Sequence, residues 1–110
     1  MPTTYKVLGQ VAPAAATEVN LYTVPVSTQA VVSSIAITNQ AASSATFRIA
    51  VRPSADATTA EKHYLVYGTT VGAADTVVLT IGVTLAAGDK IIGYGSNANL
   101  SYSAYGSEIS

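Results

Sequence analysis

The segment Thr46-Phe47-Arg48-Ile49-Ala50-Val51-Arg52 decides the fold class, because its large apolar side chains stand at every second position. In an extended chain Phe47, Ile49 and Val51 point to one side, and Arg48 and Arg52 point to the other. A period of two is typical of a β-strand with one buried face. The sequence therefore predicts a half-buried strand with a polar outer face.

The same period recurs before and after this segment. In 76–81 it places Val77, Leu79 and Ile81 inward, and in 31–38 it places Val31, Ile35 and Ile37 on one face. Further β-branched or aromatic runs are 5–8, 21–24, 64–67, 90–96 and 100–105. Turn signals separate these runs at 25–28, 39–44, 72–75, 86–89 and 97–99.

Several short strands and no sustained helical period indicate an all-β protein. The chain of 110 residues is long enough for one domain, 1–110. We expect an antiparallel β-sandwich, either a jelly roll or Ig-like, or a small barrel. The body spans 18–110, and its longest polar interruption, 53–61, has room for one helical turn at 56–61. Residues 1–17 are predicted to form an extended N-terminal arm and a linker that contains Pro13, and the alternative for the first segment is an internal strand.

The composition excludes several classes of site. Charged residues make up 10% of the chain, against about 25% in an ordinary soluble domain, and the net charge is −1. There is no Cys and one His, so a disulfide framework, a thiolate site and a His-rich metal site are excluded. The charge balance gives no footprint for a nucleic acid. No apolar run approaches about 20 residues, and the N-terminus lacks the pattern of a secretory signal. We expect no cofactor, no metal, no nucleic acid partner and no membrane partner.

The low charge also predicts association. A surface built mainly from Ala, Ser, Thr and Tyr lacks the charge that keeps a monomer apart from its copies. We infer that part of this surface packs against copies of the chain or against a larger assembly.

His63 is the only candidate general base of its kind. A catalytic role requires an orienting carboxylate and a nucleophile within reach. Glu61, close in sequence and solvated, is a poor partner, so we interpret His63 as a loop or interface residue. The acidic residues are scattered, and Asp75 and Asp89 are expected to cap backbone N–H groups in turns. The chain is therefore predicted not to be an enzyme, and a hydrolase that depends on His63 is kept as a third hypothesis.

Two glycine-containing phrases have structural interpretations. Gly88-Asp89-Lys90 is typical of a turn between strands, where Gly88 supplies a positive φ. Gly93-Tyr94-Gly95 lies inside a predicted strand, where glycines mark a bulge or a close backbone approach. Neither phrase is a phosphate-binding or dinucleotide-binding loop.

The arginines and tyrosines are the candidate interface residues. With Lys62, Arg48 and Arg52 form the only basic cluster, which is either a solvated face or a row that pairs with acids of a neighbouring subunit. The seven tyrosines combine apolar area with a polar tip, which suits an interface, a sugar-binding face or the core. The candidate interface set is Tyr5, Val7, Tyr22, Arg48, Arg52, Tyr94, Tyr102 and Tyr105.

Stretches along nearly the whole chain resemble one group of proteins. They are TYKVLGQ (4–10), NLYTVP (20–25), QAVVSSI (29–35), FRIAVRP (47–53) and LSYSAYG (100–106). These phrases resemble small virion structural proteins of tailed bacteriophages, particularly phages of cyanobacteria. The resemblance implies a β-rich, non-enzymatic protein present in many copies. Some such proteins are head decoration (cement) proteins that staple capsomers, often as trimers, and others belong to the tail or its fibres.

Composition, strand pattern and resemblance together predict a capsid decoration protein. It would be assembled in the host bacterial cytoplasm and located in the virion. Its expected partners are copies of itself, with a trimer favoured, and other virion proteins such as the major capsid protein. The alternative is a tail or tail-fibre component that contacts host surface glycans.

Overall fold

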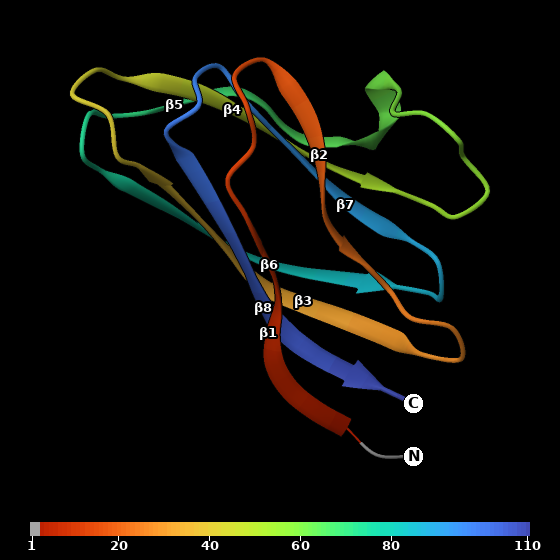
Figure 1. Cartoon of the computed structure of the whole chain (residues 1–110). Coiled ribbons are helices and arrows are strands. Elements are labelled where there is room, and N and C mark those ends of the chain that lie inside the picture. The colour runs from red at the N-terminus through yellow and green to blue at the C-terminus, as the bar shows by residue number, and fades with distance from the viewer. Residues whose placement is uncertain (1–2) are drawn as a thin grey trace.

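The computed structural model describes residues 3–110, which form two four-stranded antiparallel sheets packed face to face (Figure 1). Sheet A has the order β1-β8-β3-β6, and sheet B has the order β2-β7-β4-β5. The strands of sheet A are β1 (Thr3–Val11), β8 (Leu100–Ile109), β3 (Gln29–Asn39) and β6 (Thr76–Leu85). Those of sheet B are β2 (Thr17–Thr23), β7 (Lys90–Gly95), β4 (Ala45–Arg52) and β5 (Tyr64–Val71).

This strand order is that of an eight-stranded jelly roll, in which successive strands alternate between the sheets except for β4 and β5, which are neighbours in sheet B. The predicted antiparallel β-sandwich is confirmed in its jelly-roll form, and the sheets do not close into a barrel. Each of the five predicted turn segments connects two strands.

The core lies between the sheets and contains the predicted inward residues of β4. Phe47 and Ile49 are fully buried, and Val51 packs against the same core while partly exposed. The residues of β6 that were predicted to point inward also pack against this core. They are only half-buried, because β6 is an edge strand; they are Val77, Leu79 and Ile81.

A β-bulge in β3 makes one inward prediction wrong. The pairing of β3 with both neighbours shifts between Val32 and Ser34, and relative to β8 Ser33 is an extra residue. An extra residue reverses the alternation of side chains. Val32 is therefore fully buried together with Ile35 and Ile37, whereas Val31 points outward and is only half-buried.

The predicted N-terminal arm is a strand of the body. Thr3–Val11 pairs with β8 along its length, with a bulge at Leu8, and Leu8 packs in the core. The chain then passes through residues 12–16 to β2 in the other sheet. Gly9 lets β1 cross close to β2, since a Cβ at this position would overlap the Leu21 carbonyl oxygen. Residues 1–2 of the expected arm lie outside the described residues.

The long β4–β5 connection covers part of the outer face of sheet B. Its helical turn is a 3-10 turn, η1 (Glu61–His63), slightly later than predicted. Ala50 and Ile92 are paired, buried and outside the inter-sheet core. Their alternation with inward neighbours places them on the outer face of sheet B. Among the described residues no helix is long and apolar enough to cross a membrane.

Candidate functional site

The outer face of sheet A carries no charged side chain in any of its four described strands. Strand register defines its rows, because residues paired across strands share a face. Three successive rows are Tyr5–Ser107–Val31–Thr84, Val7–Tyr105–Ser34–Thr80 and Gln10–Ser103–Ala36–Val78. We call this surface the neutral face. It presents hydroxyl groups, small side chains and apolar side chains over the width of a whole sheet.

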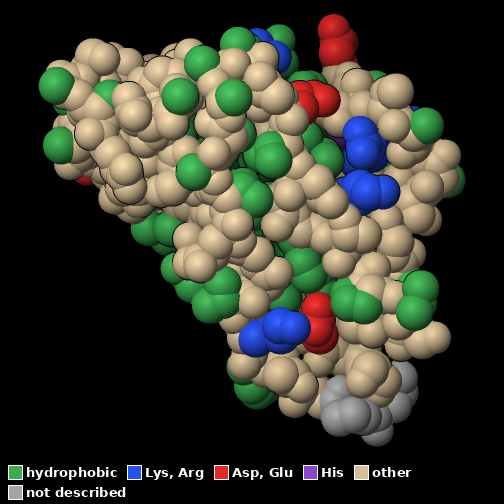
Figure 2. Space-filling view, viewed as in Figure 1, with side chains coloured by type: hydrophobic (Ala, Val, Ile, Leu, Met, Phe, Trp, Pro, Cys, Tyr) green, Lys and Arg blue, Asp and Glu red, His purple; other side chains and the backbone are tan. Residues whose placement is uncertain are grey.

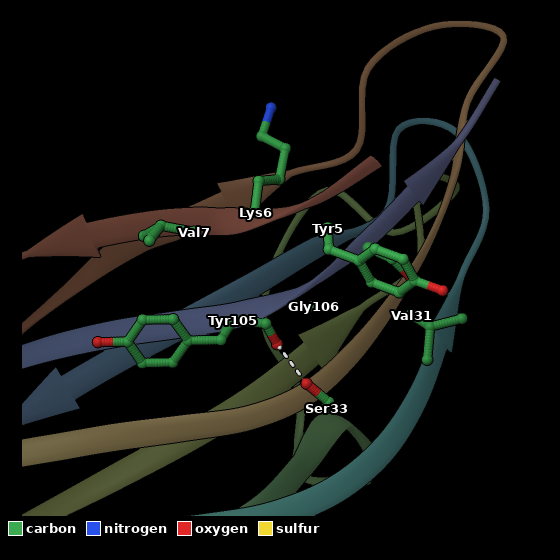
Figure 3. Close-up of a pocket in the computed structure, with 8 residues that line it drawn as sticks. Tyr5, Lys6, Val7, Val31, Ser33, Tyr105 and Gly106 are labelled. Carbon is green, nitrogen blue, oxygen red and sulfur yellow. Dashed lines mark hydrogen bonds between the residues drawn. The ribbon is translucent and has the colours of Figure 1, made fainter. Parts of the chain in front are cut away.

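A shallow depression lies at one end of the neutral face (Figure 3). It has a volume of about 620 Å³, and its lining includes Tyr5, Val7 and Tyr105. These three side chains are 84%, 47% and 38% exposed. The Ser33 hydroxyl donates a hydrogen bond to the Tyr105 carbonyl oxygen at 3.1 Å, which ties the bulge of β3 to β8. Three of the predicted interface residues therefore lie together on one accessible surface.

One charged residue, Lys6, also lines the depression, and it forms an ion pair with Glu108. Lys6 and Glu108 belong to inward rows of β1 and β8, and the Lys6 ammonium lies 3.1 Å from the Glu108 carboxylate. The space-filling view shows charged side chains only in small, separated groups on the visible side of the molecule (Figure 2).

Tyr22 is a core residue, so its predicted place at an interface is wrong for the isolated chain. It is 7% exposed, and its hydroxyl donates a hydrogen bond to Glu108 Oε2 at 2.5 Å. Burial, with the Glu108 carboxylate beside it, raises the pKa of the Tyr22 phenol. The hydrogen bond from Tyr22, with the Lys6 ammonium nearby, lowers the pKa of Glu108.

Tyr102 is also in the core and is fully buried, which corrects the second interface prediction. Its hydroxyl donates to the Tyr94 carbonyl oxygen at 2.5 Å, and burial raises the pKa of the phenol. A Cβ at Gly93 would lie 3.3 Å from the Tyr102 ring, and one at Gly95 would lie 3.0 Å from its hydroxyl. The two glycines thus make room for this side chain, as the prediction of a close approach requires.

The outer face of sheet B carries most of the strand-borne charge. One row crosses all four strands as Glu18–Tyr94–Arg48–Tyr67. The Arg48 guanidinium carbon lies 4.2 Å from the ring centroid of Tyr67 and 4.2 Å from that of Tyr94. Arg48 is therefore held between two aromatic rings by cation–π contacts within the chain.

Arg52 also has a partner within the chain. Its Nη1 donates a hydrogen bond to Thr59 Oγ1 of the β4–β5 connection at 3.2 Å. The two predicted basic interface residues are thus built into the outer face of sheet B, on the opposite side of the sandwich from Tyr5, Val7 and Tyr105.

Tyr64, Tyr67 and Glu61 form a corner beside this row. The Tyr64 and Tyr67 rings meet edge to face, with centroids 4.9 Å apart and an interplanar angle of 85°. The Tyr64 hydroxyl donates to Glu18 Oε2 at 3.2 Å, and burial together with this bond raises the pKa of the Tyr64 phenol. The corner opens on a cavity of about 450 Å³ that Glu61 also lines. Sequence reasoning missed this site, because a bulge in the β4–β5 pairing brings both tyrosines to one face.

His63 fixes the β4–β5 connection. It is 5% exposed, its Nδ1 accepts a hydrogen bond from the Ala60 N–H at 2.8 Å, and its Nε2 donates to Asp56 Oδ2 at 2.8 Å. The neutral ring with a proton on Nε2 satisfies both contacts. The hydrogen bond from His63 lowers the pKa of Asp56. Both ring nitrogens of His63 therefore have hydrogen-bond partners, and the carboxylate that contacts the ring is that of Asp56, not Glu61.

The remaining acidic candidates are turn residues, as predicted. The Asp89 carboxylate accepts hydrogen bonds from the N–H groups of Ser54 and Ala86, each at 2.9 Å. Asp75 accepts one from the Thr76 N–H at 2.8 Å. Gly88 has a φ of 85°, which fits its predicted role. Within residues 3–110 no group of three His, Cys, Asp or Glu side chains could hold a metal ion.

No known protein family matches the chain, and no curated protein is similar to it. The outer faces of the two sheets are the candidate functional surfaces.

Proposed function

We propose that the chain is a structural component of a tailed-bacteriophage particle, namely a capsid decoration protein that acts as a homotrimer. The observation that carries this proposal is the neutral face, which spans four strands without a charged side chain. Exposed charges are depleted at the cores of protein interfaces, where tyrosine is enriched. A face of this kind packs against a second protein surface without burying an unpaired charge.

The fold supports the same role. Jelly rolls occur in viral capsid proteins and in lectins. The chain also has no disulfide to stabilise it, so burial between subunits offers the stability that a particle outside a cell requires. Its resemblance to virion proteins supplies the particular setting, a phage head.

Sedimentation of the purified chain tests the role of the neutral face. We expect an oligomer at micromolar concentration, and dissociation when Ser103→Lys places a charge near the centre of the face. An uncompensated buried charge costs several kcal/mol, so the dissociation constant should rise about 100-fold or more. The matched control is Thr70→Lys, which places the same charge on an exposed position of β5 in sheet B. A monomeric wild-type chain, or equal behaviour of the two variants, would refute this use of the face.

Labelled electron microscopy of particles tests the location. Gold-labelled antibody against the chain should decorate the head of the phage that encodes it, and peptides of the chain should appear in purified particles. Label confined to the tail would instead support a tail or tail-fibre component that contacts host surface glycans. The Tyr64–Tyr67 corner on sheet B favours that second candidate.

A further inference from the structure

The corner on sheet B is a rigid aromatic surface that is open to solvent. Tyr67 is 63% exposed, yet one face of its ring is covered by the Arg48 guanidinium at 4.2 Å and Tyr64 meets it edge to face. A ligand that binds to an already ordered side chain avoids much of the entropy cost of binding. Exposed tyrosines held in this way supply contact area at low cost.

The backbone turn that carries Glu61 is anchored as well. Glu61 begins the 3-10 turn that ends at His63, and His63 is anchored at both ring nitrogens. The turn therefore holds Glu61 in the lining of the same cavity as the two rings. The cavity volume, about 450 Å³, lies within the range typical of small-molecule sites.

The corner combines the guanidinium of Arg48 with the carboxylates of Glu61 and Glu18, so its charges do not favour a ligand of either sign. A cation bound against Tyr67 would be repelled by Arg48, which already occupies the ring. An anion would be repelled by the carboxylates of Glu61 and Glu18. A neutral pyranose ring meets neither penalty, because its weakly positive C–H groups pack on an aromatic ring and its hydroxyls donate to a carboxylate.

We propose that Tyr67, Tyr64 and Glu61 form a binding site for one neutral hexopyranose unit of a glycan. Tyr67 and Tyr64 provide the stacking surface, Glu61 accepts hydrogen bonds from the sugar hydroxyls, and Arg48 is a positioning residue that holds Tyr67. This inference deepens the second candidate function and rests on it for its biological setting. Binding by the isolated chain is measured separately from the location in the particle, so the failure of one is distinguishable from the failure of the other.

The test is an NMR titration of the purified full chain. The probes are the methyl glycosides of glucose, galactose, mannose and N-acetylglucosamine, with choline as a cation and N-acetylneuraminic acid as an anion. At about 10 mM, where a site with a millimolar dissociation constant is mostly filled, at least one neutral glycoside should shift the Tyr64 and Tyr67 ring resonances. Tyr67→Ala should weaken this binding about 10-fold or more, and Glu61→Gln about 3-fold to 10-fold.

The matched control is Tyr5→Ala, which removes an exposed tyrosine from the other sheet and should leave binding unchanged. Since Tyr67 and Tyr5 are both exposed, their variants should keep the unfolding midpoint close to that of the wild type. The proposal is overturned if no neutral glycoside binds, if choline or N-acetylneuraminic acid binds in preference, or if binding survives Tyr67→Ala.

Discussion

Removing the hydroxyl group of Tyr102 tests whether this residue stabilises the core or an interface. Tyr102→Phe keeps the ring that packs beside Gly93 but deletes the hydrogen bond to the Tyr94 carbonyl oxygen, which measures 2.5 Å. The side chain is fully buried, so water cannot replace the lost donor. Such a loss costs about 1–2 kcal/mol of the free energy of unfolding. For a domain of this size the melting temperature should fall by about 5–10 °C.

The assay is thermal unfolding followed by circular dichroism, with the oligomeric state measured by sedimentation. The matched control is Tyr105→Phe, which removes a hydroxyl from a tyrosine of the same strand that is 38% exposed. This change should stay within about 0.5 kcal/mol of the wild type. The reasoning is refuted if Tyr102→Phe leaves the melting temperature unchanged, or if it dissociates an oligomer without lowering the stability of the subunit.

Three further predictions concern ionisation, the β4–β5 connection and a glycine. The free energy of unfolding should fall above about pH 10, since the pKa of Tyr22 is raised in the folded state and the phenol of the unfolded chain releases its proton first. The urea midpoints measured at about pH 9 and about pH 11 should therefore differ less for Tyr22→Phe than for the wild type. Asp56→Ala removes the hydrogen-bond partner of His63, so amide exchange in the β4–β5 connection should accelerate while the core strands keep their protection; equal acceleration everywhere would contradict a local role. Gly106→Ala should destabilise the sandwich by about 3 kcal/mol or more, because the added Cβ would overlap a carbonyl oxygen of β3. Gly82→Ala is the control, since its Cβ would meet open space. Equal melting temperatures of the two variants would show that the bulge of β3 moves to accommodate the methyl group at no cost.

The fold class could be predicted from local pattern because a strand with one buried face repeats every two residues. Phe47 and Ile49 show this repeat in β4, and the turn residue Gly88 shows where one strand ends. The prediction was wrong for Val31 because a bulge reverses the repeat, and the bulge depends on how β3 pairs with β6 and β8. The sequence leaves open whether the N-terminal segment is an arm or a strand of the body, because its partner, β8, lies at the other end of the chain.

The candidate sites could be predicted only in part, since a tyrosine suits a core and a surface equally well. Tyr5 and Tyr105 are exposed as expected, whereas Tyr22 and Tyr102 are buried beside hydrogen-bond acceptors on other strands, Glu108 of β8 and the Tyr94 carbonyl oxygen of β7. The Tyr64–Tyr67 corner depends on a register shift that no local pattern reveals.

The sequence by itself determined that the chain forms short antiparallel strands, that few charges are available, and that the surface is rich in hydroxyl groups and tyrosine. Only the tertiary structure decided where those charges lie. Cross-strand register gathers Glu18, Arg48 and Arg52 on sheet B and leaves the outer face of sheet A neutral. The physical reason is that alternation assigns each residue to one of two sides, whereas its neighbours on that side come from strands distant in sequence.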